Sequence, residues 1–331
     1  MSGAEAFEGP DEPARAEGGE AVAAERCAAH GATGPALASH PNVSVRLGAL
    51  PVDRALPLRG RRLVGAWCFL DRFGPLAFDA GRPMDVAPHP HIGLQTVTWL
   101  LEGEVRHADS LGAEALARPG TVNVMTAGRG IAHAEWTPTP GAGRLHGVQL
   151  WVALPEAQRH TAPDFQHVPE APALELPGGR ARVFSGALAG VASPARHHTP
   201  LVGAEVEVDP GARGLELPLE PAHEHAALVL AGDVSLDGHP LAAGHLHYLG
   251  LGRAGVCLAS AAGARLLLVG GAPFDESVLM WWNFVARTPE EIALARADWT
   301  EGRRFGDVPR YPGPRLEAPP LHRLARPQPA S

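Results

Sequence analysis

The sequence contains no lysine, so arginine supplies every fixed positive side-chain charge. Alanine, glycine, arginine and proline are used heavily, and we interpret both features as the coding bias of a GC-rich genome. The formal net charge is −8 at pH 7. A protein that binds a phosphate backbone needs a basic surface, so this charge disfavours such a partner. We therefore expect no nucleic-acid partner.

Long apolar runs are also missing. No window of about 20 apolar residues occurs, so no membrane span is expected. The N-terminus is acidic and lacks the basic and apolar regions of a secretory signal. The only cysteines are Cys27, Cys68 and Cys257. They are odd in number, too far apart for a CxxC zinc site, and more typical of reduced thiols than of a disulfide framework. Together these features predict a cytoplasmic protein.

Short runs of β-branched and aromatic residues follow one another, separated by Gly and Pro. Residues 94–101 and 121–126 are examples, and such runs at intervals of roughly ten residues are typical of a β-sandwich or barrel. The strand and turn at residues 100–105 have a counterpart at 230–234. The turn at residues 118–120 likewise has one at 242–244. This repetition predicts an internal duplication that gives two barrels of similar design.

The composition also predicts where the domains begin and end. The predicted parts are a disordered N-terminal segment at 1–40, a first barrel at 41–155, a Pro-rich linker at 156–179, a second barrel with a short C-terminal helix at 180–305, and a loose tail at 306–331. The helix should begin at the capping box of residues 288–291. Residues 280–285 are too apolar for an exposed tail, so we expect them to pack across one barrel or between the two.

The most informative motif consists of two closely spaced pairs, His89 with His91 and His133 with Glu135. Residues i and i+2 of a strand point to the same face, so each pair can aim both side chains at one point. Two such strands facing each other inside a barrel would surround one ion with four ligands. The alternative is that all four are solvated loop residues. Three nitrogen donors and one oxygen donor suit Fe(II), Mn(II), Ni(II), Cu(II) or Zn(II), and the donors alone do not choose among them.

Several segments around these pairs resemble the pirin family of the cupin superfamily. They are residues 89–98, 101–103, 109–112, 118–120, 125–135 and 149–152. The resemblance is strongest over residues 45–155. It implies an all-β protein of two tandem jelly-roll cupin barrels, a bicupin, with one metal in the first barrel, usually iron. His89, His91, His133 and Glu135 are then the metal ligands. Gln95 stands where pirins often carry Glu, so we expect the pocket electrostatics to differ from theirs.

The resemblance also suggests a function. Some relatives cleave the flavonol quercetin with O2, which leads us to expect a quercetinase-like dioxygenase acting on a flavonol or a similar aromatic enol. Glu135 would then also serve as general base. The alternative is a metal- or redox-sensing regulatory protein that binds a protein partner without turnover. A purely structural metal is a third possibility, and zinc hydrolysis lacks a separate general base.

Other side chains have two interpretations each. His107 and Asp109 are either a hydrogen-bonded hairpin pair or a support behind the metal ligands. Gln95 is either a pocket group or such a support. Trp99 and Trp151 are expected to be core residues rather than substrate walls. The second block contains the further pairs His223 with His225 and His245 with His247, but no His-x-Glu pair follows them. We expect no second metal there.

Overall fold

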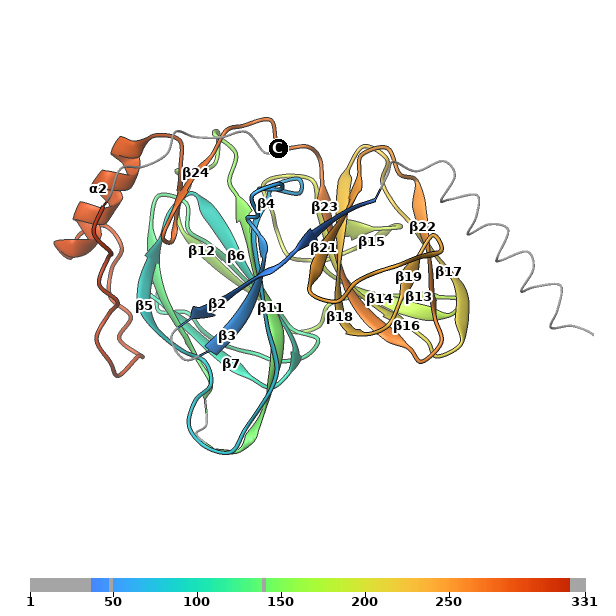
Figure 1. The fold of residues 1–331 in the computed structure, drawn as a ribbon. Helices are drawn as coiled ribbons and strands as arrows, with labels where there is room; N and C mark the ends of the chain where they lie inside the picture. The colour runs from blue at the N-terminus through green and yellow to red at the C-terminus, as the bar shows by residue number, and fades with distance from the viewer. Residues whose placement is uncertain (1–36, 48–49, 139–140, 322–331) are drawn as a thin grey trace, which may run out of the picture.

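The computed structural model describes residues 37–47, 50–138 and 141–321, and it contains two β-barrels side by side (Figure 1). Each barrel is formed by a large sheet and a four-stranded sheet. The predicted pair of jelly-roll barrels with one short helix near the C-terminus is confirmed within this part of the chain. None of the helices in the described ranges has the length and apolar character needed to cross a membrane.

The first barrel carries the predicted metal-binding pairs. In spatial order, the strands of its large sheet are β12 (Asp164–Val168), β9 (Val122–Thr126), β6 (Leu94–Glu102), β11 (Gly143–Ala153), β4 (Trp67–Phe78), β3 (Leu50–Leu56) and β2 (Val43–Leu47). Those of its small sheet are β5 (Asp85–His91), β10 (Ile131–Trp136), β7 (Val105–Asp109) and β8 (Glu114–Ala117). All six residues of β10 are buried.

The second barrel repeats this plan. Its large sheet contains β1 (Ala38–Pro41), β21 (His245–Gly250), β18 (Glu224–Gly232), β23 (Ala264–Gly271), β16 (Leu201–Val208), β14 (Gly179–Leu188) and β13 (Ala173–Leu176), with β15 (Val191–Ala192) paired to β14. Its small sheet contains β17 (Ala212–Pro218), β22 (Gly255–Ser260), β19 (Ser235–Leu236) and β20 (His239–Pro240). By position in the chain and in the sheet, β17, β22, β19 and β20 correspond to β5, β10, β7 and β8, which supports the inferred duplication.

Buried polar contacts join the two barrels. The indole N–H of Trp67 donates to the carbonyl oxygens of Val202 and Gly270 at 3.1 and 3.0 Å. The indole N–H of Trp99 donates to Oε2 of Glu205 at 2.7 Å. A buried indole N–H needs an acceptor, and here the opposite barrel provides it in both cases. The barrels therefore share a packed interface.

The segment that follows the second barrel packs against the first one. It forms a hairpin of β24 (Leu279–Trp281) and β25 (Phe284–Ala286), followed by helix α2 (Pro289–Thr300). The capping box is confirmed at the helix start, where the Thr288 hydroxyl accepts from Glu291 N and the Glu291 carboxylate accepts from Thr288 N. Ile292, Ala295 and Trp299 are buried in one cluster with residues of β10 and with Ala108 of β7. Figure 1 shows α2 on the outer side of the first barrel.

Several predicted boundaries need correction. Residues 38–41 form β1, which pairs with β21 of the second barrel, so order begins before residue 41. The predicted linker contains β12 and β13, because its prolines flank these strands instead of interrupting them. Residues 306–321 are not loose, since Leu316 N donates to Pro88 O and Leu316 O accepts from Trp299 Nε1, both at 2.8 Å. Residues 1–36 and 322–331 lie outside the described ranges.

The cysteines only partly match the expectation of three reduced thiols. Cys68 is a buried free thiol whose pKa is raised to about 12 by burial. Cys257 is disulfide-bonded, so the expectation is wrong for this residue. Cys27 lies outside the described residues.

Candidate metal centre

The two predicted metal-binding pairs lie on neighbouring strands of the small sheet. His133 on β10 stands directly opposite His89 on β5 and opposite Asp109 on β7. The next inward-facing residue of β10, Glu135, stands opposite His107. Alternation along the strands then brings all these side chains to one face. The expectation of strands facing each other across the barrel is wrong, because β5 and β10 are hydrogen-bonded neighbours.

A β-bulge adjusts the register next to these residues. His133 pairs with His89 whereas Glu135 pairs with Val86, so β5 has one residue more than β10 over this step. Pro88 lies within the bulge, where a residue without a backbone N–H is tolerated. The bulge bends β5 at the point where its two histidines point inward.

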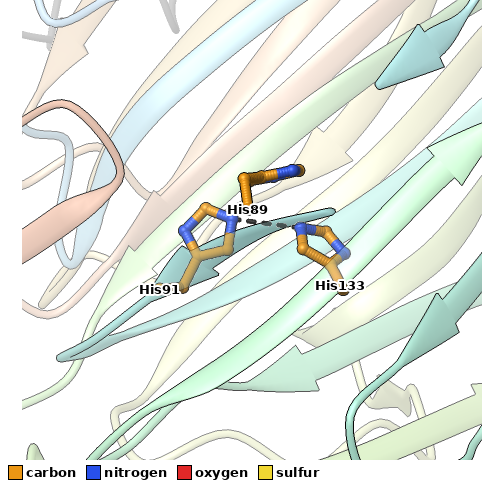
Figure 2. Close-up of side chains that lie close together, drawn as sticks. All are labelled: His89, His91 and His133. Carbon is orange, nitrogen blue, oxygen red and sulfur yellow. Dashed lines mark hydrogen bonds between the residues drawn. The ribbon is translucent and has the colours of Figure 1, made fainter. Parts of the chain in front are cut away.

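The three imidazoles converge on one point, as Figure 2 shows. One nitrogen from each of His89, His91 and His133 lies within 4.8 Å of the others. Nε2 of His91 and Nε2 of His133 are 3.0 Å apart. Two nitrogens bound to one ion at about 2.1 Å, with an angle of about 90° between them, would be separated by about 3.0 Å. The spacing therefore fits two ligands of a single metal ion.

The outer ring nitrogens of two of these histidines face carbonyl oxygens. Nδ1 of His89 lies 2.9 Å from Ala87 O, and Nδ1 of His91 lies 3.0 Å from Asn283 O. A carbonyl oxygen only accepts, so each Nδ1 carries the proton and each Nε2 presents a lone pair. Burial lowers the pKa of His89 to about 4 and holds the pKa values of His91 and His133 well below 6.5. All three rings are thus neutral near pH 7, as metal ligands must be.

Glu135 lines the same cavity as the three imidazoles and adds a carboxylate to the cluster. One of its oxygens lies within 4.8 Å of ligand nitrogens of His107 and His133. The Thr98 hydroxyl donates to Glu135 Oε1 at 3.1 Å and lies 3.0 Å from the side-chain amide of Gln149. Burial raises the pKa of Glu135. An ionised carboxylate at this depth needs positive charge nearby, which a bound cation would supply.

A cavity of about 400 Å³ opens onto these ligands. Its walls are mainly apolar, and Phe69 and Trp151 lie stacked at a centroid distance of 4.0 Å. Trp151 also meets the His91 ring edge-on at 5.2 Å. Trp151 belongs to the hydrophobic core, as expected, and its ring also forms part of the cavity wall. Trp282 and Leu316, from the C-terminal segment, line the cavity as well.

An ion pair supplies polar groups to another part of the cavity wall. Arg54 donates from Nε and Nη2 to the two carboxylate oxygens of Asp71, both at 2.8 Å. The guanidinium also lies 4.7 Å from the centroid of the Phe69 ring. Arg54 and Phe69 both line the cavity. The Arg54 guanidinium thus packs against the Phe69 ring and stabilises the ring in this position. It also brings N–H groups to the cavity wall.

The other singled-out residues have distinct positions. His107 and Asp109 form the predicted hydrogen bond, with Nε2 and Oδ2 at 3.1 Å, and His107 Nδ1 also lies 3.3 Å from His133 Nδ1. Gln95 does not line the cavity. Its side chain reaches Thr126 and His197 beside the second barrel, with Nε2 donating to Thr126 Oγ1 at 2.9 Å and Oε1 3.0 Å from His197 Nδ1.

Sequence reasoning missed four groups that shape this site: Thr98, Arg54, Trp282 and the carbonyl of Asn283. Thr98 lies in a run that the sequence predicts as a strand, but nothing in the sequence aligned it with Glu135. Trp282 and Asn283 follow the ligands by more than 140 residues. No local spacing connects them to the first barrel.

The histidines of the second barrel lie on the wrong strands for an equivalent site. His245 and His247 belong to β21, and His225 belongs to β18, both in the large sheet. The counterpart of β10 is β22, which carries neither histidine nor carboxylate. Within the described ranges, groups of three possible metal ligands occur only in the first barrel.

Comparisons with known proteins agree with this architecture. Residues 50–152 match the family model described as Pirin, and residues 203–306 match the Pirin C-terminal cupin domain. A Pseudomonas aeruginosa protein provisionally named quercetin 2,3-dioxygenase is 48% identical over 275 residues, which cover 83% of this chain and 87% of that protein. A pirin-like protein of Caulobacter vibrioides is 39% identical over 264 residues, 78% of this chain and 90% of that protein.

A solved structure extends the likeness to three dimensions. The crystal structure of a quercetin 2,3-dioxygenase from Acinetobacter baumannii superposes with a TM-score of 0.83 at 42% identity. The superposition covers 88% of this chain and 97% of that one. With two matching family domains, two barrels of one design and relatives aligned over most of their length, the chain belongs to the pirin family of bicupins.

Proposed function

We propose that His89, His91, His133 and Glu135 bind one divalent transition metal ion in the first barrel. Two of the three imidazoles have Nδ1 held by a carbonyl oxygen, and all three are neutral at pH 7, so the donors are already in the form that binds a metal. We expect Fe(II) as the native ion. Mn(II), Ni(II), Cu(II) and Zn(II) suit the same mixture of nitrogen and oxygen donors.

We further propose that this centre supports an oxygen-dependent ring opening of a flavonol or a similar planar aromatic enol. The observation that carries this proposal is the cavity of about 400 Å³ that joins an aromatic wall to the histidine cluster. Its volume lies in the range of small-molecule sites, and a flat ring system can stack on the surface formed by Phe69 and Trp151. The names of two relatives, from P. aeruginosa and A. baumannii, point to the same substrate class.

Each side chain has a defined task in this reaction. A bound divalent metal supplies a Lewis acid that favours the ionised form of a substrate hydroxyl. Glu135, when it loosens from the metal, takes the hydroxyl proton as general base. Thr98 holds the carboxylate in place through its hydrogen bond to Oε1. The apolar walls exclude water while Phe69 and Trp151 orient the ring.

The test uses the protein loaded in turn with Fe(II), Mn(II), Ni(II), Cu(II) and Zn(II). Each form is incubated with quercetin with and without O2, and the ring-opened product and O2 consumption are measured. We expect product only with O2 and with at least one redox-active ion. Thr98→Val should retain the fold and slow turnover about 5- to 13-fold, because the carboxylate loses a donor worth roughly 1–1.5 kcal/mol.

Absence of ring-opened product with every ion would contradict the dioxygenase proposal. If the wild-type protein then still bound one metal per chain, the regulatory alternative would gain support. That alternative requires a specific protein partner whose binding depends on the metal and is lost in His89→Ala and His133→Ala.

A further inference from the structure

We propose that His107 and Asp109 are positioning residues that set the tautomer of His133 and so make it a metal ligand. This inference rests on the proposed metal site in the first barrel. The three side chains form a continuous buried chain on β10 and β7. His133 Nδ1 lies 3.3 Å from His107 Nδ1, and His107 Nε2 lies 3.1 Å from Asp109 Oδ2.

The carboxylate of Asp109 fixes the direction in which hydrogen bonds are donated along these three side chains. Its Oδ1 accepts two backbone N–H groups, from Leu111 at 2.9 Å and Ala113 at 3.0 Å. Its Oδ2 therefore remains for His107, and an ionised carboxylate only accepts. The proton between the two side chains must reside on Nε2 of His107.

A neutral His107 with its proton on Nε2 has a lone pair on Nδ1. That lone pair faces Nδ1 of His133, so His133 donates from Nδ1 and keeps the lone pair of Nε2 free. Nε2 of His91 is free for the same reason, because Asn283 O accepts from its Nδ1. Two lone pairs thus meet 3.0 Å apart at the centre of the cluster. Neither ring supplies a proton between them, whereas a metal ion satisfies both.

Packing keeps His107 in the required orientation. Its ring is stacked on Phe165 of β12, with centroids 4.3 Å apart and ring planes inclined by 9°. His107 and Asp109 are both almost fully buried. Neither rotation of the His107 ring nor exchange with water therefore reverses the donor and acceptor roles of these three side chains.

Asp109→Asn directly tests the direction of hydrogen-bond donation from His133 through His107 to Asp109. The two backbone N–H groups still require an oxygen acceptor, so the new NH₂ group takes the position of Oδ2 and donates to His107. His107 must then carry its proton on Nδ1 and donate to His133, which moves the His133 proton to Nε2. We expect the affinity for Co(II), measured by competition with a chelator, to fall roughly 10- to 100-fold. We also expect ¹⁵N spectra of the metal-free protein to show His133 changing from the Nδ1–H to the Nε2–H tautomer.

Two variants of His107 provide the matched control. His107→Asn offers an amide oxygen close to the former Nδ1 and should keep Co(II) affinity within a few-fold of wild type. His107→Leu offers no acceptor and should lose affinity as Asp109→Asn does. If His107 were itself a metal ligand, the Asn and Leu variants would both lose the metal as completely as His133→Ala, and the inference would be wrong.

The remaining outcomes separate this inference from the proposed function. Unchanged Co(II) affinity and an unchanged His133 tautomer in Asp109→Asn would overturn the inference while leaving the metal site intact. Failure of the wild-type protein to bind any divalent ion would overturn the proposed function. The tautomer of His133 in the metal-free wild type would still decide the inference, and the Nε2–H form there would reject it.

Discussion

Nδ1 of His91 lies 3.0 Å from the backbone carbonyl oxygen of Asn283, which follows it by 192 residues. The orientation of His91, a proposed metal ligand on β5, therefore depends on a hairpin that follows the second barrel in the sequence. The same hairpin places Trp282 in the cavity wall. The candidate site therefore combines strands of the first barrel with a hairpin close to the C-terminal end of the described residues.

Replacing His91 by alanine should abolish metal binding at the centre. The ring supplies one of the two nitrogens that lie 3.0 Å apart, and a directly bound ligand should matter more than its hydrogen-bonded supports, whose loss typically costs 10- to 100-fold. We expect affinity to fall by about 100-fold or more, measured by elemental analysis and chelator competition. His239→Ala, an exposed histidine of the second barrel, is the control. Equal metal content in both variants would contradict the proposed ligand set.

Replacing Trp282 by alanine should weaken substrate binding without affecting the metal. The indole lines the cavity but is not a proposed metal ligand. Residue 282 has φ 51°, which strains any residue except glycine, so the change from Trp to Ala leaves this backbone strain unchanged. Loss of an aromatic contact worth about 0.5–1.5 kcal/mol predicts a KM for the flavonol that is raised roughly 2- to 10-fold. Steady-state kinetics on metal-loaded protein would measure it. Trp281→Ala, which does not line the cavity, should leave KM unchanged.

Replacing Trp99 by phenylalanine should loosen the contact between the barrels. The substitution leaves Oε2 of the buried Glu205 without the indole donor, although Arg265 still donates to Oε1 at 2.6 Å. Leaving a buried acceptor unpaired costs about 1–3 kcal/mol. Urea unfolding should show a loss of that size, with metal affinity unchanged. Trp136→Phe is the comparison, since the Trp136 indole makes no hydrogen bond to another described residue, and an equal loss there would refute the role of the Glu205 contact.

Stability should fall as the pH drops below neutrality, in part because of His225. This side chain is 1% exposed, and burial lowers its pKa from 6.5 to about 4. The unfolded chain therefore binds a proton at higher pH than the folded chain, so stability is fully present above about pH 6.5 and is lost as the pH falls toward 4. Linkage gives a loss of about 2 kcal/mol between about pH 7.5 and about pH 5 from this group.

The His225→Gln variant should lose that part of the pH dependence. Urea unfolding of wild type and variant at the two pH values measures the difference. His239→Gln should keep the wild-type dependence, because His239 is exposed. If His225→Gln lost as much stability as the wild type between the two pH values, the pKa of His225 would not differ between the folded and unfolded states.

Local patterns in the sequence were sufficient for several elements. The i, i+2 spacing of His133 and Glu135 predicted that both point inward, because successive residues of a strand alternate between faces. The capping box at Thr288 predicted where α2 begins. It did not predict which barrel the helix covers, since the apolar residues Ile292 and Trp299 require a partner surface but do not specify it.

Other expectations failed because they depended on which strands become neighbours. Gln95 lies on a strand that is buried on both faces, and the sequence could not tell the face toward the metal cluster from the face toward the second barrel. The prolines between residues 155 and 177 suggested a linker, yet β12 lies between two of them and supplies the ring that stacks on His107.

The order of residues by itself determined that the chain makes two similar β-barrels and that the first of them carries inward-pointing imidazoles and a carboxylate. These properties follow from the short-range geometry of strands and turns. Only the tertiary structure decided that β5 and β10 are neighbours, that a distant carbonyl faces Nδ1 of His91, and that Asp109, His107 and His133 lie in a row. Hydrogen bonds between distant segments depend on how the sheets close and pack, which no local pattern specifies.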